Sequence, residues 1–325
     1  MTDYEQIVVL GWDALDLELA EQYGAADSFG AHQTKIKTYV NEHIGEPHTL
    51  ELWPSMILGQ PPDEHSIRAA TPDEGVDWDN PLLNTASSLA NGIVPQPVLT
   101  EIGARLRERG VGVSQKTASE YREEGKDVIF DAGDRPISVP NYETAWDRRH
   151  GLDAARNGIW AALEVDRSVN EGIEPQVNID RVQSVIGQAY GHRTGLTLAA
   201  LQAGRPLVWT WFGLIDSVGH IAPAVEYPLE AEAYRIAAAI SNLIRKTAPP
   251  ETAVVSVSDH GLQDGEHTHY ATLAADDPDI VERVTAVDEL AGWIRDVNPD
   301  GRTVGGEATQ SHGEMAEQLE ALGYI

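Results

Sequence analysis

Short apolar runs rich in β-branched residues alternate along the chain with longer amphipathic segments. The runs predict strands at residues 6–11, 34–40, 111–117, 207–212 and 252–258. The amphipathic segments predict helices at residues 13–22, 54–58, 97–109, 152–162, 179–203, 229–246, 287–297 and 314–322. Apolar strands that alternate with helices favour an α/β fold, in which a mostly parallel central sheet is sandwiched between helices.

The chain shows no internal repeat, low-complexity tract or clear linker, so we expect one domain over residues 1–325. The stretch at about 118–200 contains few predicted strands. It includes residues 118–141, which we expect to be irregular because they contain Pro136 and Pro140. This stretch is therefore a candidate for a small cap inserted into the core fold.

The chain is strongly acidic, with 52 acidic and 23 basic residues and a formal net charge of −29. The acidic residues are spread along the chain, which indicates a solvated acidic surface suited to a high-salt cytoplasm. Because no basic stripe is visible, binding to duplex nucleic acid through its phosphates is not expected.

The sequence lacks a membrane span, a secretion signal and cysteine, and each absence excludes a class of location or site. No apolar stretch approaches the roughly 18 residues that a membrane span needs, and residues 1–6 show no secretion signal. We therefore expect a cytoplasmic protein without a membrane partner. Cysteine is also absent, so any metal must be held by Asp, Glu, His and hydroxyl groups.

Acidic side chains, two of them with a histidine nearby, follow three of the predicted buried strands. They are Asp13, Asp216 with His220, and Asp259 with His260. Their spacing places Asp216 and His220 on one face of a starting helical turn. Ligand sites in an open parallel sheet lie beyond the carboxyl ends of the strands. Asp and His gathered there favour a pair of divalent metal ions.

Two further parts of the chain offer groups to such a site. Residues 265–269 supply a third imidazole, from His267 or His269, and we favour His267. His312 is a more distant candidate. Residues 46–65 supply two hydroxyl groups, Thr49 and Ser55, and either is a candidate nucleophile.

The order of these motifs resembles the alkaline phosphatase superfamily, and most closely its type I phosphodiesterase/nucleotide pyrophosphatase branch. Gly59, Pro62 and His65 match the glycine, proline and histidine of that branch's TG-x-x-P-x-x-H-G element. In that branch the nucleophile precedes the glycine by ten positions, which is the position of Thr49 here. The resemblance therefore favours Thr49 over Ser55, and Trp53 falls where the family often has a tryptophan.

The resemblance implies a site with two divalent metal ions, Zn²⁺ or alternatively Mn²⁺. It assigns one metal to Asp13, Thr49, Asp259 and His260, and the other metal to Asp216, His220 and His267. The implied activity is hydrolysis of phosphate diesters or monoesters of a small substrate, through a phosphothreonine intermediate on Thr49.

Two alternatives stay open, a phosphomutase on the same scaffold and a non-catalytic protein that binds metal or a phosphorylated ligand. A sulfatase is not expected, because residues 49–53 lack the C/S-x-P-x-R motif that sulfatases of the superfamily need. The substrate, the metal and the oligomeric state do not follow from the sequence.

Overall fold

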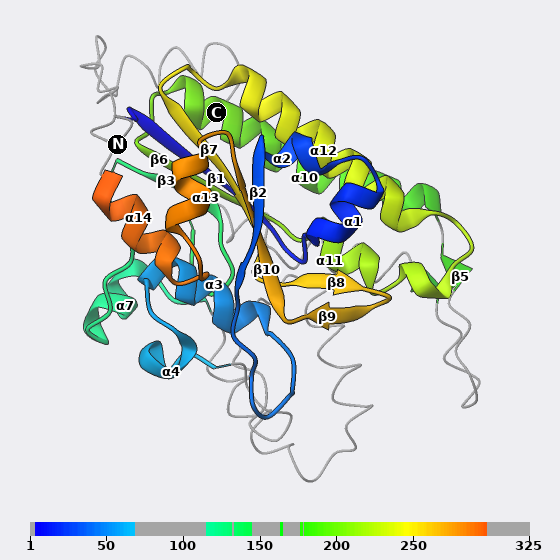
Figure 1. Cartoon of the computed structure of the whole chain (residues 1–325), viewed down its shortest axis with the longest axis horizontal. Helices are drawn as coiled ribbons and strands as arrows, with labels where there is room; N and C mark the ends of the chain where they lie inside the picture. The colour runs from blue at the N-terminus through cyan, green and yellow to red at the C-terminus, as the bar shows by residue number, and fades with distance from the viewer. Residues whose placement is uncertain are drawn as a thin grey trace, which may run out of the picture.

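The computed structural model describes residues 4–68, 115–131, 133–144, 163–164, 176–177 and 179–297. Within these residues, the main sheet has six strands in the order β2-β10-β7-β1-β6-β3 (Figure 1). The strands are β1 (Gln6–Trp12), β2 (His32–Lys37), β3 (Arg135–Ser138), β6 (Leu207–Phe212), β7 (Thr252–Val257) and β10 (Tyr270–Ala275).

The middle of this sheet is parallel. Strand β1 pairs in parallel with β6 on one side and β7 on the other, and β3 pairs in parallel with β6. Strand β10 is antiparallel to both of its neighbours, β7 and β2. The register places Trp12 beside Phe212 and Gly11 beside Val257, so the carboxyl ends of β1, β6 and β7 lie next to one another.

Helices cover both faces of the sheet (Figure 1). One layer contains α1 (Leu17–Gln22), α2 (Ala26–Phe29), α10 (Ile179–Gln202), α11 (Leu214–Gly219) and α12 (Leu229–Thr247). The other contains α3 (Thr49–Leu58), α7 (Ala118–Glu123), α13 (Pro278–Arg283) and α14 (Glu289–Val297), with α4 (Pro62–His65) beside α3. Alternate residues of β1 face the two layers, with Ile7 and Val9 in one core cluster and Val8 and Leu10 in the other.

Smaller elements complete the described part of the chain. They are the 3₁₀-helix η1 (Ala222–Ala224), the paired strands β4 (Leu163–Glu164) and β5 (Gln176–Val177), and the hairpin of β8 (Gly261–Gln263) and β9 (Glu266–Thr268). The hairpin follows β7 directly and lies at the carboxyl end of the sheet (Figure 1).

Helix α3 approaches β1 closely because of a glycine. A Cβ atom on Gly11 would lie 2.7 Å from Cη2 and Cζ3 of Trp53, which is fully buried. Pro54 lies inside α3 and has no N–H group to donate to the carbonyl of Leu50, four residues earlier. The side chain of Asn141 donates to that carbonyl instead, at 2.6 Å. Two long-range contacts therefore fix the first turns of α3.

The predicted fold class is confirmed: the protein is α/β, with a mostly parallel central sheet between helices. The strand predictions at 6–11, 207–212 and 252–258 agree with the structure to within one residue, as does the helix prediction at 179–203. The helix predicted at 229–246 extends one residue further, to Thr247.

Other boundaries were wrong. Helix α1 begins at Leu17, not at residue 13, because Asp16 caps it and Ala14 has a left-handed φ of 62°. Helix α3 begins at Thr49, five residues before the prediction. Residues 118–141 contain α7 and β3, and β10 was not predicted.

Some predictions lie wholly or partly outside the described residues. These are the helices at 97–109, 152–162 and 314–322 and most of the strand at 111–117. The cap at about 118–200 stays a prediction, although β3 and most of α10 fall in that range and belong to the main sheet and its helical layer.

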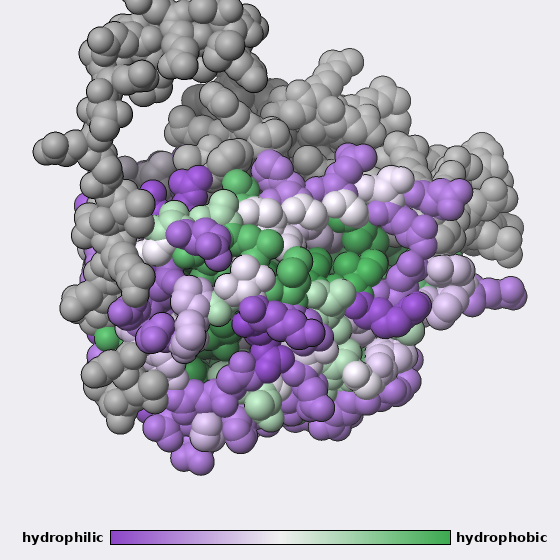
Figure 2. Space-filling view, turned by 90° about the horizontal axis from the view of Figure 1, so that it is seen from above, coloured by the Kyte–Doolittle hydropathy of each residue, from purple (hydrophilic) through white to green (hydrophobic). Residues whose placement is uncertain are grey.

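Figure 2 shows one face of the molecule, on which hydrophobic residues gather near the centre and hydrophilic residues surround them. Among the described residues, the large hydrophobic side chains that are exposed are Val40, Ile44, Tyr227 and Leu243. No helix in the described ranges has both the length and the apolar character to cross a membrane.

We expect Gly11→Ala to lower the free energy of unfolding by about 1–3 kcal/mol, because the new methyl group overlaps the buried Trp53 ring. Gly191→Ala is the control: the glycine is exposed on α10, where an added Cβ meets nothing within 4 Å. The control should raise the same quantity by about 1 kcal/mol through helix propensity. Urea titrations of the three proteins measure both effects, and equal stability of wild type and Gly11→Ala would contradict the contact.

Candidate functional site

The carboxyl ends of β1, β6 and β7 bring three acidic residues together. The N–H of Asp13 donates to the carbonyl of Phe212 at 3.0 Å, and the N–H of Asp216 donates to the carbonyl of Asp13 at 3.2 Å. The backbone hydrogen bonds that pair β1 with β6 thus continue beyond the carboxyl ends of both strands. The N–H of Ala14, whose positive φ turns the chain, donates to Oδ1 of Asp259 at 3.4 Å. Backbone N–H groups therefore hold Asp216 to Asp13 and the Asp259 side chain to the turn that follows Asp13.

A first group of side chains surrounds His260. Its Nε2 lies 3.6 Å from Oδ1 of Asp13, 3.4 Å from Oδ2 of Asp259 and 3.4 Å from Oγ1 of Thr49. The Thr49 hydroxyl also donates to Oδ1 of Asp13, at 3.2 Å. Asp13, Asp259 and His260 are buried. These four residues are the set that the family resemblance assigns to one metal.

A second group surrounds Asp216, in the first turn of α11. Its Oδ1 lies 3.1 Å from Nε2 of His220 and 3.7 Å from Nε2 of His267. The two Nε2 atoms are 3.1 Å apart. His260 joins the two groups, because its ring stacks on His267 with centroids 4.0 Å apart. The structure thus brings all seven predicted site residues into one cluster.

Backbone carbonyls orient the three imidazoles. Each Nδ1 atom faces a carbonyl oxygen: Gly265 for His220 at 3.2 Å, Gly261 for His260 at 3.1 Å and Pro47 for His267 at 3.0 Å. A carbonyl only accepts hydrogen bonds, so we infer that each Nδ1 carries a hydrogen. When such an imidazole is neutral, its Nε2 lone pair points into the cluster, as a metal-ligating histidine requires.

The charges in the second group depend on one another. Burial raises the pKa of the Asp216 carboxyl, but hydrogen bonds from His220 and His267 outweigh burial and leave that pKa well below its usual range. The same contact with Asp216 raises the pKa of His220 above the ordinary histidine value. The cluster therefore attracts positive charge, whether from protons or from a metal.

The residues present fit a divalent metal. Oδ2 of Asp259 is buried and has no hydrogen-bond partner within the described part of the chain. A buried carboxylate oxygen is costly without a partner, and a cation supplies one. Asp13, Asp259 and His260 offer ligand atoms within 4.8 Å of one another, and so do Asp216, His260 and His267. Nitrogen and oxygen donors of these kinds suit Zn²⁺ and permit Mn²⁺.

The competing candidates lie elsewhere or serve the fold. His269 is exposed between β9 and β10, and His312 lies outside the described residues. Ser55 is fully buried, and its hydroxyl donates to the carbonyl of Glu51 at 3.0 Å. Nε2 of His65 lies 2.9 Å from the same hydroxyl. Burial lowers the pKa of His65 to about 4, so this imidazole is neutral near pH 7.

The groups that orient the site carry no signal in the amino-acid sequence. The carbonyls of Pro47, Gly261 and Gly265 have no side-chain signal, because every residue carries a carbonyl. His48, which caps α3, accepts from the N–H of Leu50 at 3.2 Å through Nδ1. An imidazole is an uncommon helix cap, so His48 did not mark the start of α3 in the sequence.

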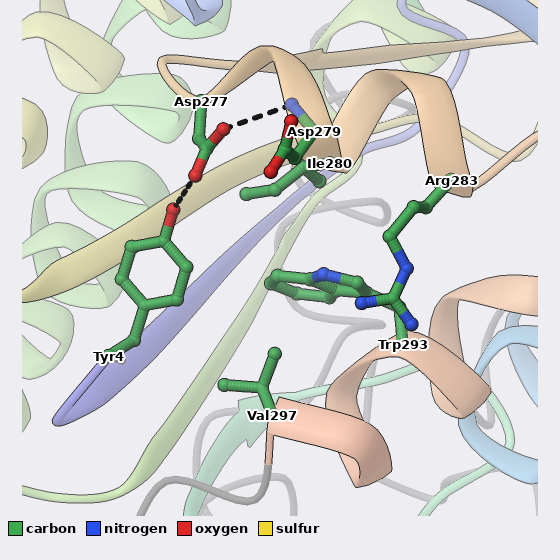
Figure 3. A pocket seen from close by; sticks show the side chains of 7 residues that line it. All are labelled: Tyr4, Asp277, Asp279, Ile280, Arg283, Trp293 and Val297. Carbon is green, nitrogen blue, oxygen red and sulfur yellow. Dashed lines mark hydrogen bonds between the residues drawn. The ribbon is translucent and has the colours of Figure 1, made fainter. Parts of the chain in front are cut away.

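A separate cavity lies at the other end of the sheet. Its volume is about 260 Å³, and it is lined by Tyr4, Asp277, Asp279, Ile280, Arg283, Trp293 and Val297 (Figure 3). The Tyr4 hydroxyl donates to Asp277, whose other oxygen accepts from the N–H of Asp279 at 2.9 Å. Asp277 thus caps α13 and serves the fold. We place the candidate chemistry at the carboxyl ends of the strands instead.

No protein-family model matches this chain, and no curated protein matches it. Solved structures resemble it at low identity. An alkaline phosphatase from the Antarctic bacterium TAB5 is 11% identical with a TM-score of 0.39, covering 93% of this chain and 99% of that one. A protein from Pyrococcus horikoshii is 9% identical with a TM-score of 0.46, covering 94% and 100%. A 2-O GAG sulfatase is 10% identical with a TM-score of 0.48, covering 96% and 74%. At these values the likenesses establish no activity for this chain.

His267→Gln should lower the affinity for Zn²⁺ and Mn²⁺ by at least about tenfold, because it removes one of the converging Nε2 lone pairs. His269→Gln is the matched control, two residues away and exposed, and should bind both metals like the wild type. Isothermal titration calorimetry of the chelator-treated proteins gives the affinities. Equal losses in the two variants would contradict the assignment of His267.

Protons should compete with metal at the second group. Because Asp216 raises the pKa of His220, this imidazole holds its proton to a higher pH than an ordinary histidine. A protonated imidazole cannot bind a metal, so the affinity should fall as the pH drops through that raised pKa. The Mn²⁺ affinity should be measured at several pH values from about 8 down to about 5, the range in which histidine gains its proton. An affinity that stays constant over this range would contradict the ligand set.

Proposed function

We propose that this chain is a metal-dependent hydrolase of phosphate esters, with Thr49 as its nucleophile. The observation that supports this most is the position of the Thr49 hydroxyl, 3.2 Å from Oδ1 of Asp13 and 3.4 Å from Nε2 of His260. A hydroxyl among candidate metal ligands is placed to attack an ester held by the same site.

The start of α3 favours an anionic ester. Thr49 is the first residue of this helix, and the N–H groups of a helix start point toward the space in front of it. The N–H of Leu50 is already bound to the His48 side chain, which keeps the first turn regular. Thr49 therefore stands where the helix dipole and the metal site both stabilise negative charge.

Thr49 is favoured over Ser55 by the contacts of the two hydroxyls. The Ser55 hydroxyl is fully buried and donates within its own helix, to Glu51. The Thr49 hydroxyl is only part-buried and donates to Asp13, a candidate metal ligand. A nucleophile needs access to substrate, and in the described structure only Thr49 of these two residues has it.

The proposed reaction has two displacements at phosphorus. When bound, divalent cations supply Lewis-acid stabilisation of the attacking and leaving oxygens. In the first step Oγ1 of Thr49 bonds to phosphorus, the ester's leaving oxygen departs, and the Thr49 proton passes by way of Oδ1 of Asp13 to that leaving oxygen. In the second step water attacks the phosphothreonine, one of its protons restores the Thr49 hydroxyl, and phosphate is released from a monoester or a phosphate monoester from a diester. Every phosphorus–oxygen bond formed is matched by one broken.

The proposed partner is a small phosphorylated substrate. The net charge of −29 opposes the approach of an anion, but salt screens exposed charges beyond about 8 Å at physiological ionic strength. The start of α3 provides local positive potential that attracts the ester at short range, and cations held by Asp13, Asp216, Asp259 and the three histidines would add to it.

Thr49→Ala should lower kcat at least about 1,000-fold for p-nitrophenyl phosphate and bis-p-nitrophenyl phosphate, assayed with Zn²⁺ or Mn²⁺, because no other hydroxyl replaces it. Ser55→Ala is the control. It should keep kcat within about threefold while lowering the free energy of unfolding by about 1 kcal/mol, since it deletes the hydroxyl that contacts Glu51 and His65. Wild-type activity in Thr49→Ala would remove Thr49 from the mechanism.

A further inference from the structure

The segment between β2 and α3 passes beside the candidate metal site. It extends beyond the carboxyl end of the sheet and returns next to the β8–β9 hairpin (Figure 1). Two consecutive residues on the returning side contact His267. The carbonyl of Pro47 lies 3.0 Å from Nδ1 of that ring, and Oε2 of Glu46 lies 3.6 Å from the same atom. The chain then leads through His48 to Thr49, the proposed nucleophile.

The turn before Glu46 is closed by Asn41. The N–H of Asn41 donates to the carbonyl of Glu46 at 2.9 Å, and the N–H of Gly45 donates to the carbonyl of Asn41 at 2.8 Å. Asn41 is buried, and its side-chain amide donates to Oε1 of Glu51 in α3 at 2.6 Å. The Glu46 carboxylate therefore reaches His267 from a backbone that is anchored to α3.

Glu46 faces the nitrogen of His267 that points away from the cluster. The other nitrogen, Nε2, lies 3.1 Å from Nε2 of His220 and 3.7 Å from Oδ1 of Asp216. A cation bound at Nε2 withdraws electron density from the imidazole and makes its Nδ1–H more positive. A carboxylate beside that N–H then stabilises the metal-bound ring more than the free ring.

The exposure of the two side chains indicates how large this effect is. Two fully exposed charged groups on a protein surface contribute little to each other's stability. The His267 side chain is only 16% exposed, so water screens its N–H weakly, whereas the Glu46 side chain is 48% exposed and keeps part of its hydration. We therefore expect a moderate effect that acts through one imidazole.

We propose that Glu46 is a positioning residue of the metal site: together with the carbonyl of Pro47, its carboxylate holds the Nδ1–H of His267 and strengthens the binding of a divalent cation at Nε2. This inference rests on the metal site of the proposed function. It adds a residue outside the seven candidate site residues, and it gives the segment before Thr49 a part in metal binding.

Glu46→Gln tests the proposal because it keeps the size of the side chain and an oxygen acceptor but removes the charge. The affinity for Mn²⁺ and for Zn²⁺ should fall at least about threefold, and only for one of the two bound ions. Isothermal titration calorimetry of the chelator-treated full chain measures both affinities. A loss smaller than about twofold in both metals would overturn the proposal.

Glu42→Gln is the matched control. Glu42 is exposed in the same segment, and its substitution changes the net charge by the same amount. It should leave both affinities within about 1.5-fold of wild type, because salt screens a charge that is not held at the site. An equal loss in Glu42→Gln and Glu46→Gln would reduce the effect to overall charge and overturn the proposal.

A double-mutant cycle shows whether Glu46 acts through His267. In a His267→Gln background there is no imidazole N–H for the carboxylate to hold, so the further substitution Glu46→Gln should change the Mn²⁺ affinity by less than about 1.5-fold. A purely structural role of Glu46 would lower the affinity by the same factor in both backgrounds, and that result would overturn the proposal.

This proposal and the proposed function fail in different ways. If the wild type hydrolyses phosphate esters and Glu46→Gln binds metal like the wild type, only the role of Glu46 is removed. If the wild type binds two ions with the expected effect of Glu46→Gln but hydrolyses neither ester, the role of Glu46 stands and the hydrolase is removed. A wild type that binds neither Mn²⁺ nor Zn²⁺ removes both.

Discussion

Two buried carboxylates that face the same imidazole are the constraint on which the site depends. Asp13 and Asp259 are 3% and 0% exposed, and oxygens of both lie within 4.8 Å of each other and of His260. At an effective dielectric constant of about 20, two unit charges about 5 Å apart repel each other by roughly 3 kcal/mol. Desolvation adds to that cost. A divalent cation among these oxygens turns the repulsion into attraction, which is the physical basis for treating the cluster as a metal site.

The parallel sheet makes such a concentration of charge possible. Strand β1 lies between β6 and β7 and runs in their direction, so residues that follow all three strands share one edge. Helix α3 then reaches the same edge because Gly11 lets the Trp53 ring lie against β1. The carboxylates come from strand ends and the proposed nucleophile, Thr49, from a helix start, and both are fixed by the same central strand.

The sequence predicted those strands and helices whose pattern of apolar and polar residues is visible within one short segment. Buried strands such as 207–212 and the residues that follow them, including Asp216, were found because apolar runs and polar ends are visible in the chain. The hairpin that carries His267 was not predicted, since strands β8 and β9 have three residues each and are too short for a period to show. The start of α3 was missed because Pro54 normally marks a helix beginning, not its interior.

That proline also connects Thr49, the proposed nucleophile, to a distant part of the chain. Pro54 leaves the carbonyl of Leu50 without its helical partner, and Asn141, 91 residues away in sequence, donates to it. Asn141 has a left-handed φ of 60°, and its own carbonyl accepts from the Tyr121 hydroxyl at 2.8 Å. The segment after β3 thus holds the first turn of α3 in place. Because Thr49 begins that turn, its position depends on contacts far outside the metal cluster, and no motif around Thr49 alone specifies it.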